Sequence, residues 1–155
     1  MNSLDCHSLA NHLILLKARI SIVHKETGLS PTYLRRIFTE IHREAPHCGP
    51  LKSSPNSLFK NYNLLKQATL YVLFYAAESR LDISTWSIIH AFRRYEAYCQ
   101  GLRERDRYLD FSSAYQLARW VDADLIYLTK CHHCRSAKLS VQDRSQNVCG
   151  VCKQS

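Results

Sequence analysis

Four cysteines near the C-terminus are the residues whose type and spacing most directly suggest chemistry. Cys131 and Cys134 form one Cys-x-x-Cys pair, and Cys149 and Cys152 form a second pair after a spacer of fourteen residues. Two such pairs can present four thiolates at the corners of a tetrahedron, which is the arrangement of structural Zn²⁺ sites. We therefore predict one structural Zn²⁺ ion per chain, held by these four cysteines.

Other uses of the four cysteines stay open at this point: disulfides, a redox-active pair or an iron–sulfur cluster. A redox-active Cys-x-x-Cys usually opens a helix in a strand–helix unit, which the pattern here does not predict. His132 and His133 lie inside the first pair and could replace one cysteine, but with four thiolates present we expect both to face solvent. A shell filled by protein ligands leaves no open position for a substrate, so the site would be structural.

The residues around the cysteines indicate how the tail folds. The stretch 138–141, Lys-Leu-Ser-Val, is typical of a short strand, so we expect a β-hairpin in the tail. Gly150 within the second pair should let the backbone curl so that amides point at sulfur. The tail, residues 129–155, has few large apolar side chains. Bound metal would therefore have to supply its folding free energy.

The chain before the cysteines is predicted to be mainly α-helical, because apolar residues recur at helical spacing. The expected helices cover about 8–26, 31–45, 58–80, 84–100 and 112–128, with an extended connector over 46–57. The apolar side of the fourth helix is expected to be buried, with Trp86, Ile89, Phe92 and Tyr95 or Ala97. The fold class is thus mainly α, with a helical domain over 1–128 and a zinc-binding module over 129–155.

The segment 18–43 matches the layout of a helix-turn-helix, since Gly28 can end one helix and Pro31 can begin the next. One face of the second helix is apolar and should pack inward: Leu34, Ile37, Phe38 and Ile41. The other face presents side chains that can contact DNA phosphates or base edges: Thr32, Tyr33, Arg35, Arg36, Thr39 and Arg43. The alternative is a helical hairpin with a solvated basic face, and the pattern alone does not separate the two.

The formal net charge is +8, and the excess lies at the two ends of the chain. Residues 1–60 and 129–155 each carry a net +4, whereas residues 61–128 are neutral. This distribution fits two basic regions that meet a polyanion, although a generic basic protein is the alternative interpretation. In the tail we predict that Arg135 and Lys138 contact DNA phosphates.

Several function classes are not supported by the sequence. No apolar run approaches the ~20 residues that cross a bilayer, and the N-terminus lacks the layout of a secretory signal. We therefore expect a soluble cytoplasmic protein without a membrane partner, in a compartment where disulfides rarely persist. Paired carboxylates, a phosphate-binding glycine loop and a nucleophile–base signature are all lacking. We expect neither an enzyme nor a small-molecule substrate.

A resemblance to a known family extends from about Ala18 to Cys152. It is carried by A-R-I…E-T-G-L-S…L-R-R-I-F-T-E-I-H-R, P-H-C-G, A-F-R-R-Y-E-A-Y-C-Q, A-Y-Q-L-A-R-W-V-D-A-D-L-I-Y-L-T-K-C-H-H-C and C-G-V-C. In this order the stretches resemble FlhC, the zinc-bearing subunit of the bacterial flagellar transcriptional activator. The helical stretches are moderately specific one by one, whereas their order before the paired cysteines is specific.

The resemblance implies a cytoplasmic activator of flagellar genes that binds double-stranded promoter DNA. It also implies a hetero-oligomer with FlhD, a smaller helical partner, and contact with RNA polymerase. The zinc ligands of the family correspond to Cys131, Cys134, Cys149 and Cys152. The alternative is a zinc-containing adaptor or interaction protein, a shortened FlhC paralogue with weak or no promoter binding.

Overall fold

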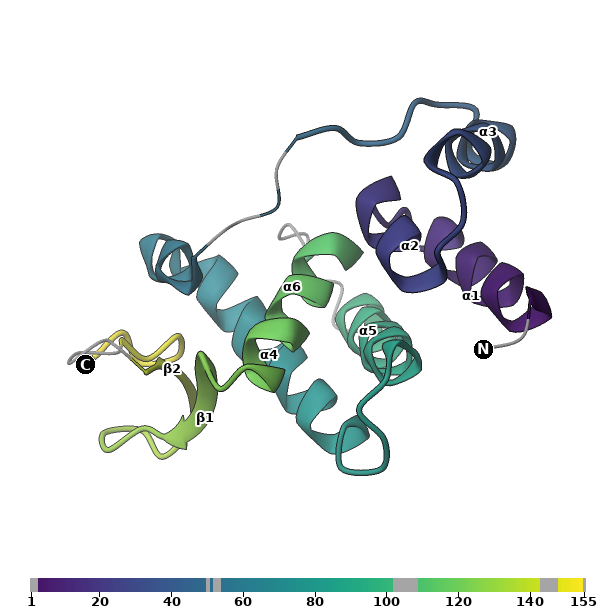
Figure 1. The fold of residues 1–155 in the computed structure, drawn as a ribbon. Coiled ribbons are helices and arrows are strands. Elements are labelled where there is room, and N and C mark those ends of the chain that lie inside the picture. The colour runs from purple at the N-terminus through teal and green to yellow at the C-terminus, as the bar shows by residue number, and fades with distance from the viewer. Residues whose placement is uncertain (1–2, 50, 52–53, 102–108, 143–147, 155) are drawn as a thin grey trace. The chain divides into compact units, whose positions relative to one another are not determined.

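The computed structural model describes residues 3–49, 51, 54–101, 109–142 and 148–154, and its helices and strands are labelled in Figure 1. The chain divides into two compact units. Unit 1 consists of residues 1–51 with 110–112, and unit 2 consists of 52–109 with 113–155. Among the described helices, none combines the length and the apolar character needed to cross a membrane.

Unit 1 contains three helices: α1 (Ser3–Leu15), α2 (Ile20–Thr27) and α3 (Pro31–His42). The sequence predicted one helix over 8–26, and this was wrong. Lys17 adopts a left-handed conformation with φ 54°, and the amide of Ala18 turns back to the carbonyl of Leu13 at 3.0 Å. Leu13 and Ala18 are both fully buried, so the break between α1 and α2 brings two apolar residues into the core.

Helix α3 packs through a narrower apolar stripe than the sequence predicted. Leu34 and Phe38 are buried, with 0% and 1% of their surface exposed. Ile37 is only half-buried, and Ile41 is 42% exposed, so its predicted inward position was wrong. The ring of His42 lies 4.6 Å from that of Phe38, and its Nε2 bonds to the carbonyl of Ile14 at 2.8 Å. His42 therefore closes the core at the point where Ile41 was expected.

Unit 2 begins with a short 3₁₀ helix, η1 (Pro55–Lys60), and continues through α4 (Tyr62–Glu78) and α5 (Thr85–Gly101). The predicted helix over 58–80 is interrupted at Asn61. The Asn61 side chain accepts hydrogen bonds from two amides, at 2.9 and 3.2 Å, and so caps the start of α4. The last helix, α6 (Phe111–Asp122), has its first residues in unit 1 and the rest in unit 2.

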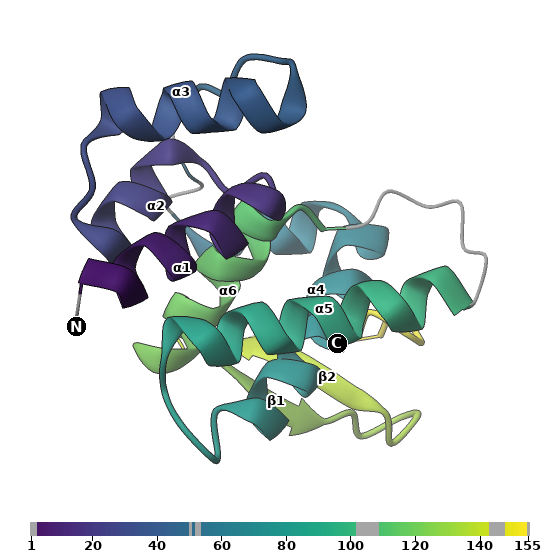
Figure 2. The ribbon, with the colours of Figure 1, turned by 90° about the vertical axis from the view of Figure 1, so that its right-hand side faces the viewer.

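Helices α4 and α5 lie side by side, as Figures 1 and 2 both show. Their interface is aromatic, with Tyr71 and Tyr95 fully buried and their rings 6.1 Å apart. The Tyr95 hydroxyl donates to Gln67 Oε1 at 2.8 Å and accepts from the amide of Leu109 at 3.1 Å. Of the predicted buried side of α5, Ile89, Phe92 and Tyr95 are buried as expected. Trp86 is 37% exposed, so its predicted burial was wrong, and of the alternatives Tyr95 and Ala97 the buried one is Tyr95.

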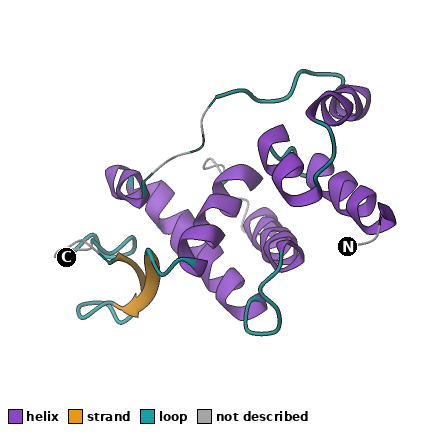
Figure 3. Cartoon of the chain, in the orientation of Figure 1, coloured by secondary structure: helices purple, strands orange, loops and turns teal. Residues whose placement is uncertain are grey.

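The C-terminal part carries the only strands among the described residues, shown in orange in Figure 3. Strand β1 (Ile126–Lys130) pairs antiparallel with β2 (Ala137–Val141), with Lys130 opposite Ala137. The hairpin was predicted, but its first strand lies before the first cysteine pair, where the sequence suggested the end of a helix. Helix α6 stops at Asp122 because Asp124 is left-handed, with φ 56°. The mainly α fold class is confirmed, and the division into domains 1–128 and 129–155 stays a prediction.

Candidate metal centre and nucleic-acid interface

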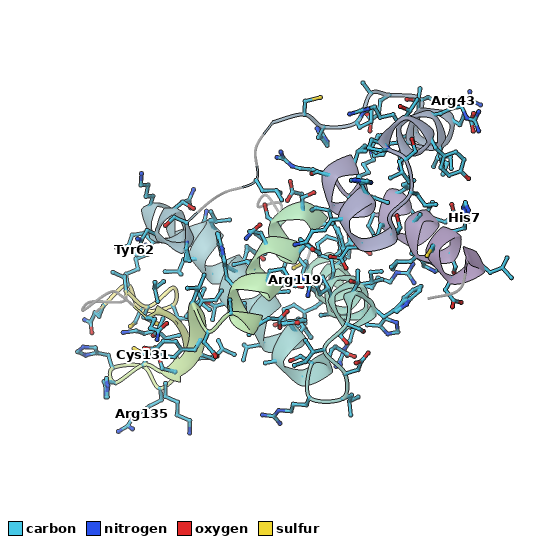
Figure 4. All side chains as sticks on the ribbon, viewed as in Figure 1. His7, Arg43, Tyr62, Arg119, Cys131 and Arg135 are labelled. Carbon is cyan, nitrogen blue, oxygen red and sulfur yellow. The ribbon has the colours of Figure 1, made fainter. Side chains whose placement is uncertain are left out.

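The four cysteines of the two pairs come together at one end of unit 2. Cys131 and Cys134 lie in the turn that joins β1 to β2, where Cys131 is labelled in Figure 4. Cys149 and Cys152 lie in a second turn near the C-terminus. Cys131 and Cys149 are buried, whereas Cys134 and Cys152 are half-buried. All four sulfur atoms lie within 4.8 Å of one another.

The sulfur positions fit a single tetrahedral metal ion. Bonds of ~2.3 Å to one ion would place tetrahedral sulfurs about 3.8 Å apart. The Sγ atoms of Cys131 and Cys152 are 3.6 Å apart, and those of Cys134 and Cys149 are 3.7 Å apart. These distances are far above the ~2.05 Å of a disulfide bond, and all seven cysteines of the chain are free thiols. In a [4Fe–4S] cluster each thiolate binds a different iron, and in a [2Fe–2S] cluster two thiolates bind each iron, so in both some of the sulfurs would lie further apart than a single ion holds them.

The two pairs sit in turns of the same backbone geometry. We call residues 131–136 the first cysteine turn and residues 149–154 the second. In each turn the amide of the first residue donates to the carbonyl of the sixth, and the amide of the fifth donates to the carbonyl of the first. The distances are 2.9 and 3.0 Å in the first turn and 2.8 and 3.0 Å in the second. The fifth residue is left-handed in both, with φ 62° at Arg135 and 61° at Lys153.

Hydrogen bonds within these turns favour thiolates at one pair of positions. The hydroxyl and amide of Ser136 lower the pKa of Cys134 to about 6. The amide of Cys134 lowers the pKa of Cys131, against the opposing effect of burial. The amide of Gln154 also acts to lower the pKa of Cys152, but burial and the neighbouring thiols raise it to about 11. A bound cation would replace the proton that Cys152 retains, since metal binding to thiols releases protons.

Gly150 fixes the second cysteine turn against helix α4. A Cβ atom at this position would lie 3.2 Å from the backbone nitrogen and 3.3 Å from the Cα of Lys66. The Val151 amide does point at sulfur, 3.4 Å from Cys149 Sγ, as the sequence suggested. Gly150 itself does not adopt a left-handed conformation. Glycine is needed here for close approach of two backbones.

The helix-turn-helix segment is formed by α2, the turn at Gly28 and α3. Gly28 is left-handed, with φ 71°, and its amide caps α2 by donating to the carbonyl of His24 at 2.8 Å. Ser30 takes the N-cap position of α3 without a side-chain hydrogen bond. Of the predicted DNA contacts, the exposed ones are Thr32, Arg35, Arg36, Thr39 and Arg43, while Tyr33 is half-buried. Arg43 follows the end of α3 in a left-handed conformation.

The polar face of α3 is partly preorganised. The Arg36 guanidinium lies 5.6 Å from the centre of the Tyr33 ring, and its Nε lies 3.7 Å from Glu40 Oε1. The Tyr33 hydroxyl lies 3.4 Å from Nδ1 of His7 on α1, and the two rings meet edge to face. Arg36 therefore contacts both the Tyr33 ring and the Glu40 carboxylate. Arg35 makes no ion pair and no ring contact with the described residues.

The predicted tail contacts lie in the other unit. Arg135 is exposed at the end of the hairpin and projects away from the ribbon in Figure 4, while Lys138 is half-buried on β2. His132 and His133 are both exposed and lie outside the sulfur cluster, as the sequence suggested. The predicted DNA contacts thus fall into one group on α3 in unit 1 and one group on the hairpin in unit 2.

The family described as "Flagellar transcriptional activator (FlhC)" matches residues 1–155. The chain belongs to the FlhC family. Flagellar transcriptional regulators FlhC from three bacteria illustrate the similarity within it. That of Gallionella capsiferriformans is 27% identical over 149 residues, covering 93% of this chain and 81% of the relative. That of Proteus mirabilis is 24% identical, covering 94% and 77%, and that of Variovorax paradoxus 28%, covering 94% and 73%.

Two contacts in this FlhC-family chain were not predicted from its sequence. Glu40 places an acidic group on the exposed face of α3, and its spacing from Arg36 could have predicted their ion pair. Lys153 lies with its Nζ 5.4 Å from the centre of the Tyr62 ring at the start of α4. No local signal relates positions so far apart in the chain, so only the fold reveals that the second cysteine turn reaches α4.

Proposed function

We propose that this FlhC-family protein binds promoter DNA as an activator of flagellar genes and carries one structural Zn²⁺ ion. The proposal of DNA binding rests on the way helix α3 is presented. Buried Leu34 and Phe38 anchor it in unit 1, while its arginines stay exposed on the opposite face. A second helix of a helix-turn-helix, presented in this way, suits the major groove of DNA.

The proposed metal is Zn²⁺ because four thiolates at tetrahedral spacing suit zinc and do not suit hard cations such as Mg²⁺ or Ca²⁺. The residues that would hold it are Cys131, Cys134, Cys149 and Cys152. When bound, the ion supplies folding free energy and leaves no coordination position for a reactant. This supports a structural role and a regulator without enzymatic activity.

The hairpin supplies a second, less specific contact with DNA. Residues 126–142 and 148–154 contain four lysines or arginines and no aspartate or glutamate. Of these, Arg135 and Lys138 are the proposed phosphate contacts. Each phosphate that they neutralise would release counterions, so binding should weaken steeply as salt concentration rises. Base readout is assigned to α3, where Arg35 or Arg36 can reach a guanine edge.

The proposed partner protein is an FlhD-type helical protein, and the proposed target of activation is RNA polymerase. Both are what the resemblance to FlhC implies, as is a cytoplasmic location. The exposed apolar residues of unit 2 support a protein partner, because surface apolar residues that gather in one region mark interaction sites. A competing function is a zinc-containing adaptor that binds a partner but no promoter.

DNA binding is tested by fluorescence anisotropy on the complex with the FlhD-type protein, using flagellar promoter DNA and scrambled DNA at several salt concentrations. Arg35→Ala should lower promoter affinity by about 1–3 kcal/mol and relax the preference at one base pair. Arg135→Ala should weaken both DNAs equally and reduce the salt slope by about one unit. Arg80→Ala removes an exposed arginine outside both contact groups and serves as the matched control.

Equal and weak binding of promoter and scrambled DNA by the unsubstituted complex would favour the adaptor. If the complex prefers the promoter but Arg35→Ala and Arg36→Ala change neither affinity nor specificity, α3 is architectural. Recognition would then belong to the hairpin or to the partner.

A further inference from the structure

Helix α4 is apolar on two sides, and only one of them is covered by unit 2. Between Lys66 and Glu78 it carries no charged residue. One row packs into the core and contains Leu65, Ala68, Val72 and Tyr75. A second row, at the helical spacing i, i+3, i+4, i+7, contains Leu70, Leu73, Phe74 and Ala77, none of them fully buried. A helix that is apolar all round is typical of a helix covered on both sides.

The outer row borders a groove of about 260 Å³, which we call the α4 groove. Its walls come from α4, from α5 and from both cysteine turns. Its lining residues are Lys66, Thr69, Leu70, Leu73, Tyr98, Ser136, Ala137, Gly150 and Val151. Leu73, Tyr98 and Val151 are 43%, 47% and 58% exposed. The Thr69 hydroxyl donates to a carbonyl of its own helix at 2.8 Å, so that hydroxyl is already satisfied.

The charged groups near the groove are mostly basic. Lys66 is its one charged lining residue, and Lys153 lies beside it over the ring of Tyr62. The one acidic residue of α4, Glu78, is bonded to Arg94 of α5 at 2.6 Å. An occupant that carries carboxylates therefore complements the groove. A second copy is disfavoured by this measure, because each chain carries a formal net charge of +8.

We propose that the α4 groove is the docking site for an amphipathic helix of a protein partner. One large aliphatic or aromatic side chain of that helix fills the groove, and flanking carboxylates face Lys66 and Lys153. The volume lies below the ~300–1,000 Å³ typical of pockets for small ligands, and it suits one anchoring side chain instead. The row of Leu70, Leu73 and Ala77 continues the contact as a ridge against which a second helix can pack.

Docking should depend on the metal ion. Ser136, Ala137, Gly150 and Val151 belong to or adjoin the cysteine turns, and they form one wall of the groove. Removing the ion would release the turns that hold this wall, since the tail has little core of its own. The inference thus rests on the proposed function in two respects: the structural metal, and an FlhD-type protein as the partner.

The experiment uses the purified FlhD-type protein as the probe and measures its affinity for the full chain by anisotropy. Leu73→Asp, Tyr98→Lys and Val151→Asp should each weaken binding roughly 10–100-fold, the effect of losing a central interface contact. Lys153→Glu should weaken binding of the probe by a smaller factor than the three groove variants. That factor should be larger at low salt, where charges are less screened. Leu15→Asp is the matched control, because Leu15 is 57% exposed on α1 in unit 1. Zinc content and circular dichroism of each variant establish that the fold is kept. Because Tyr98 lies outside the cysteine turns, Tyr98→Lys tests the groove without a substitution in either turn.

The possible outcomes separate the inference from the proposed function. If the unsubstituted chain binds the probe and all three groove variants bind equally well, the docking site is wrong while the partnership stands. If the unsubstituted chain does not bind the probe, the partnership fails and the docking site with it. Binding that survives removal of the metal would overturn the metal-dependent wall. Self-association that is lost in the groove variants, measured by sedimentation, would instead make a second copy the occupant. In that case, the segment of the second copy that enters the groove would contain Leu81 and Ile83, which are exposed and flank Asp82.

Discussion

The first and second cysteine turns share one backbone geometry but lie in different surroundings. The first is the tip of the β-hairpin, and its middle residues, His132 and His133, are exposed. The second lies against α4, and a Cβ atom at Gly150, one of its two middle residues, would be only 3.2 Å from the α4 backbone. The sulfur positions therefore depend on the Cys-x-x-Cys spacing and the left-handed fifth residue, which both turns have. The middle residues depend instead on what each turn contacts.

Removing one sulfur from either turn should have the largest effect, because the turns share the metal. Cys134→Ser and Cys149→Ser should each reduce zinc from one ion per chain to nearly none, since structural zinc sites need their full shell. Metal analysis and hydrogen exchange of residues 126–154 would measure this, with increased exchange expected across both turns. Cys48→Ser is the control, as Cys48 is an exposed free thiol outside the cluster.

Full zinc occupancy in either variant would show that the removed cysteine is not a ligand. Iron with sulfide absorption in anaerobically purified protein would contradict the zinc assignment itself.

Alanine substitution in the middle of each turn should distinguish the two turns. Gly150→Ala would place its Cβ within 3.2 Å of the α4 backbone, which cannot move aside easily. We expect a loss of about 1–3 kcal/mol in the free energy of unfolding, as for other overpacked sites. His133→Ala in the first turn should change that energy by no more than about 0.5 kcal/mol, because the side chain is exposed. Urea denaturation of the zinc-loaded proteins would measure both, and equal effects would contradict the contact with α4.

The smallest difference is expected at the left-handed fifth residues. Arg135→Gly relieves a conformation that costs a non-glycine residue about 1–2 kcal/mol, partly offset by greater freedom of the unfolded chain. We expect a net stabilisation of up to about 1 kcal/mol. Lys153→Gly should stabilise less, because it also loses a cation–π contact with Tyr62 worth about 0.5–1 kcal/mol. Thermal unfolding of the two variants in parallel would resolve the difference, and a larger gain at Lys153 would contradict it.

The same distinction explains what the sequence could predict. The cysteine spacing and the Gly28 turn act within a few residues, and the structure agrees with both. The helix break at Lys17 could not be predicted from the local sequence. The left-handed conformation of Lys17 accompanies the burial of Leu13 and Ala18 in the core. Ile41 matched the apolar stripe of α3 but is exposed, because His42 fills the space beside Phe38.

Strand β1 could not be predicted from the local sequence for a related reason. The stretch 126–130 continues the apolar pattern of α6, and only its pairing with 137–141 makes it a strand. Gly150 was noticed, but the helix that it contacts lies more than eighty positions away in the sequence. Local patterns therefore found the four clustered cysteines and the turn between α2 and α3, while contacts between distant segments decided where helices stop.

Unit 1 is not continuous in the chain, and this sets the order in which it can be completed during synthesis. The amide of Arg19 donates to the hydroxyl of Ser112 at 3.2 Å, across 93 positions. A ribosome that adds ~5–20 residues per second needs about 3–12 s to make the 52–109 segment between them. For that interval α1, α2 and α3 have emerged without the turn of α6 that belongs with them. The three nascent helices of unit 1 are thus exposed to chaperones and proteases for seconds before their last contact can form.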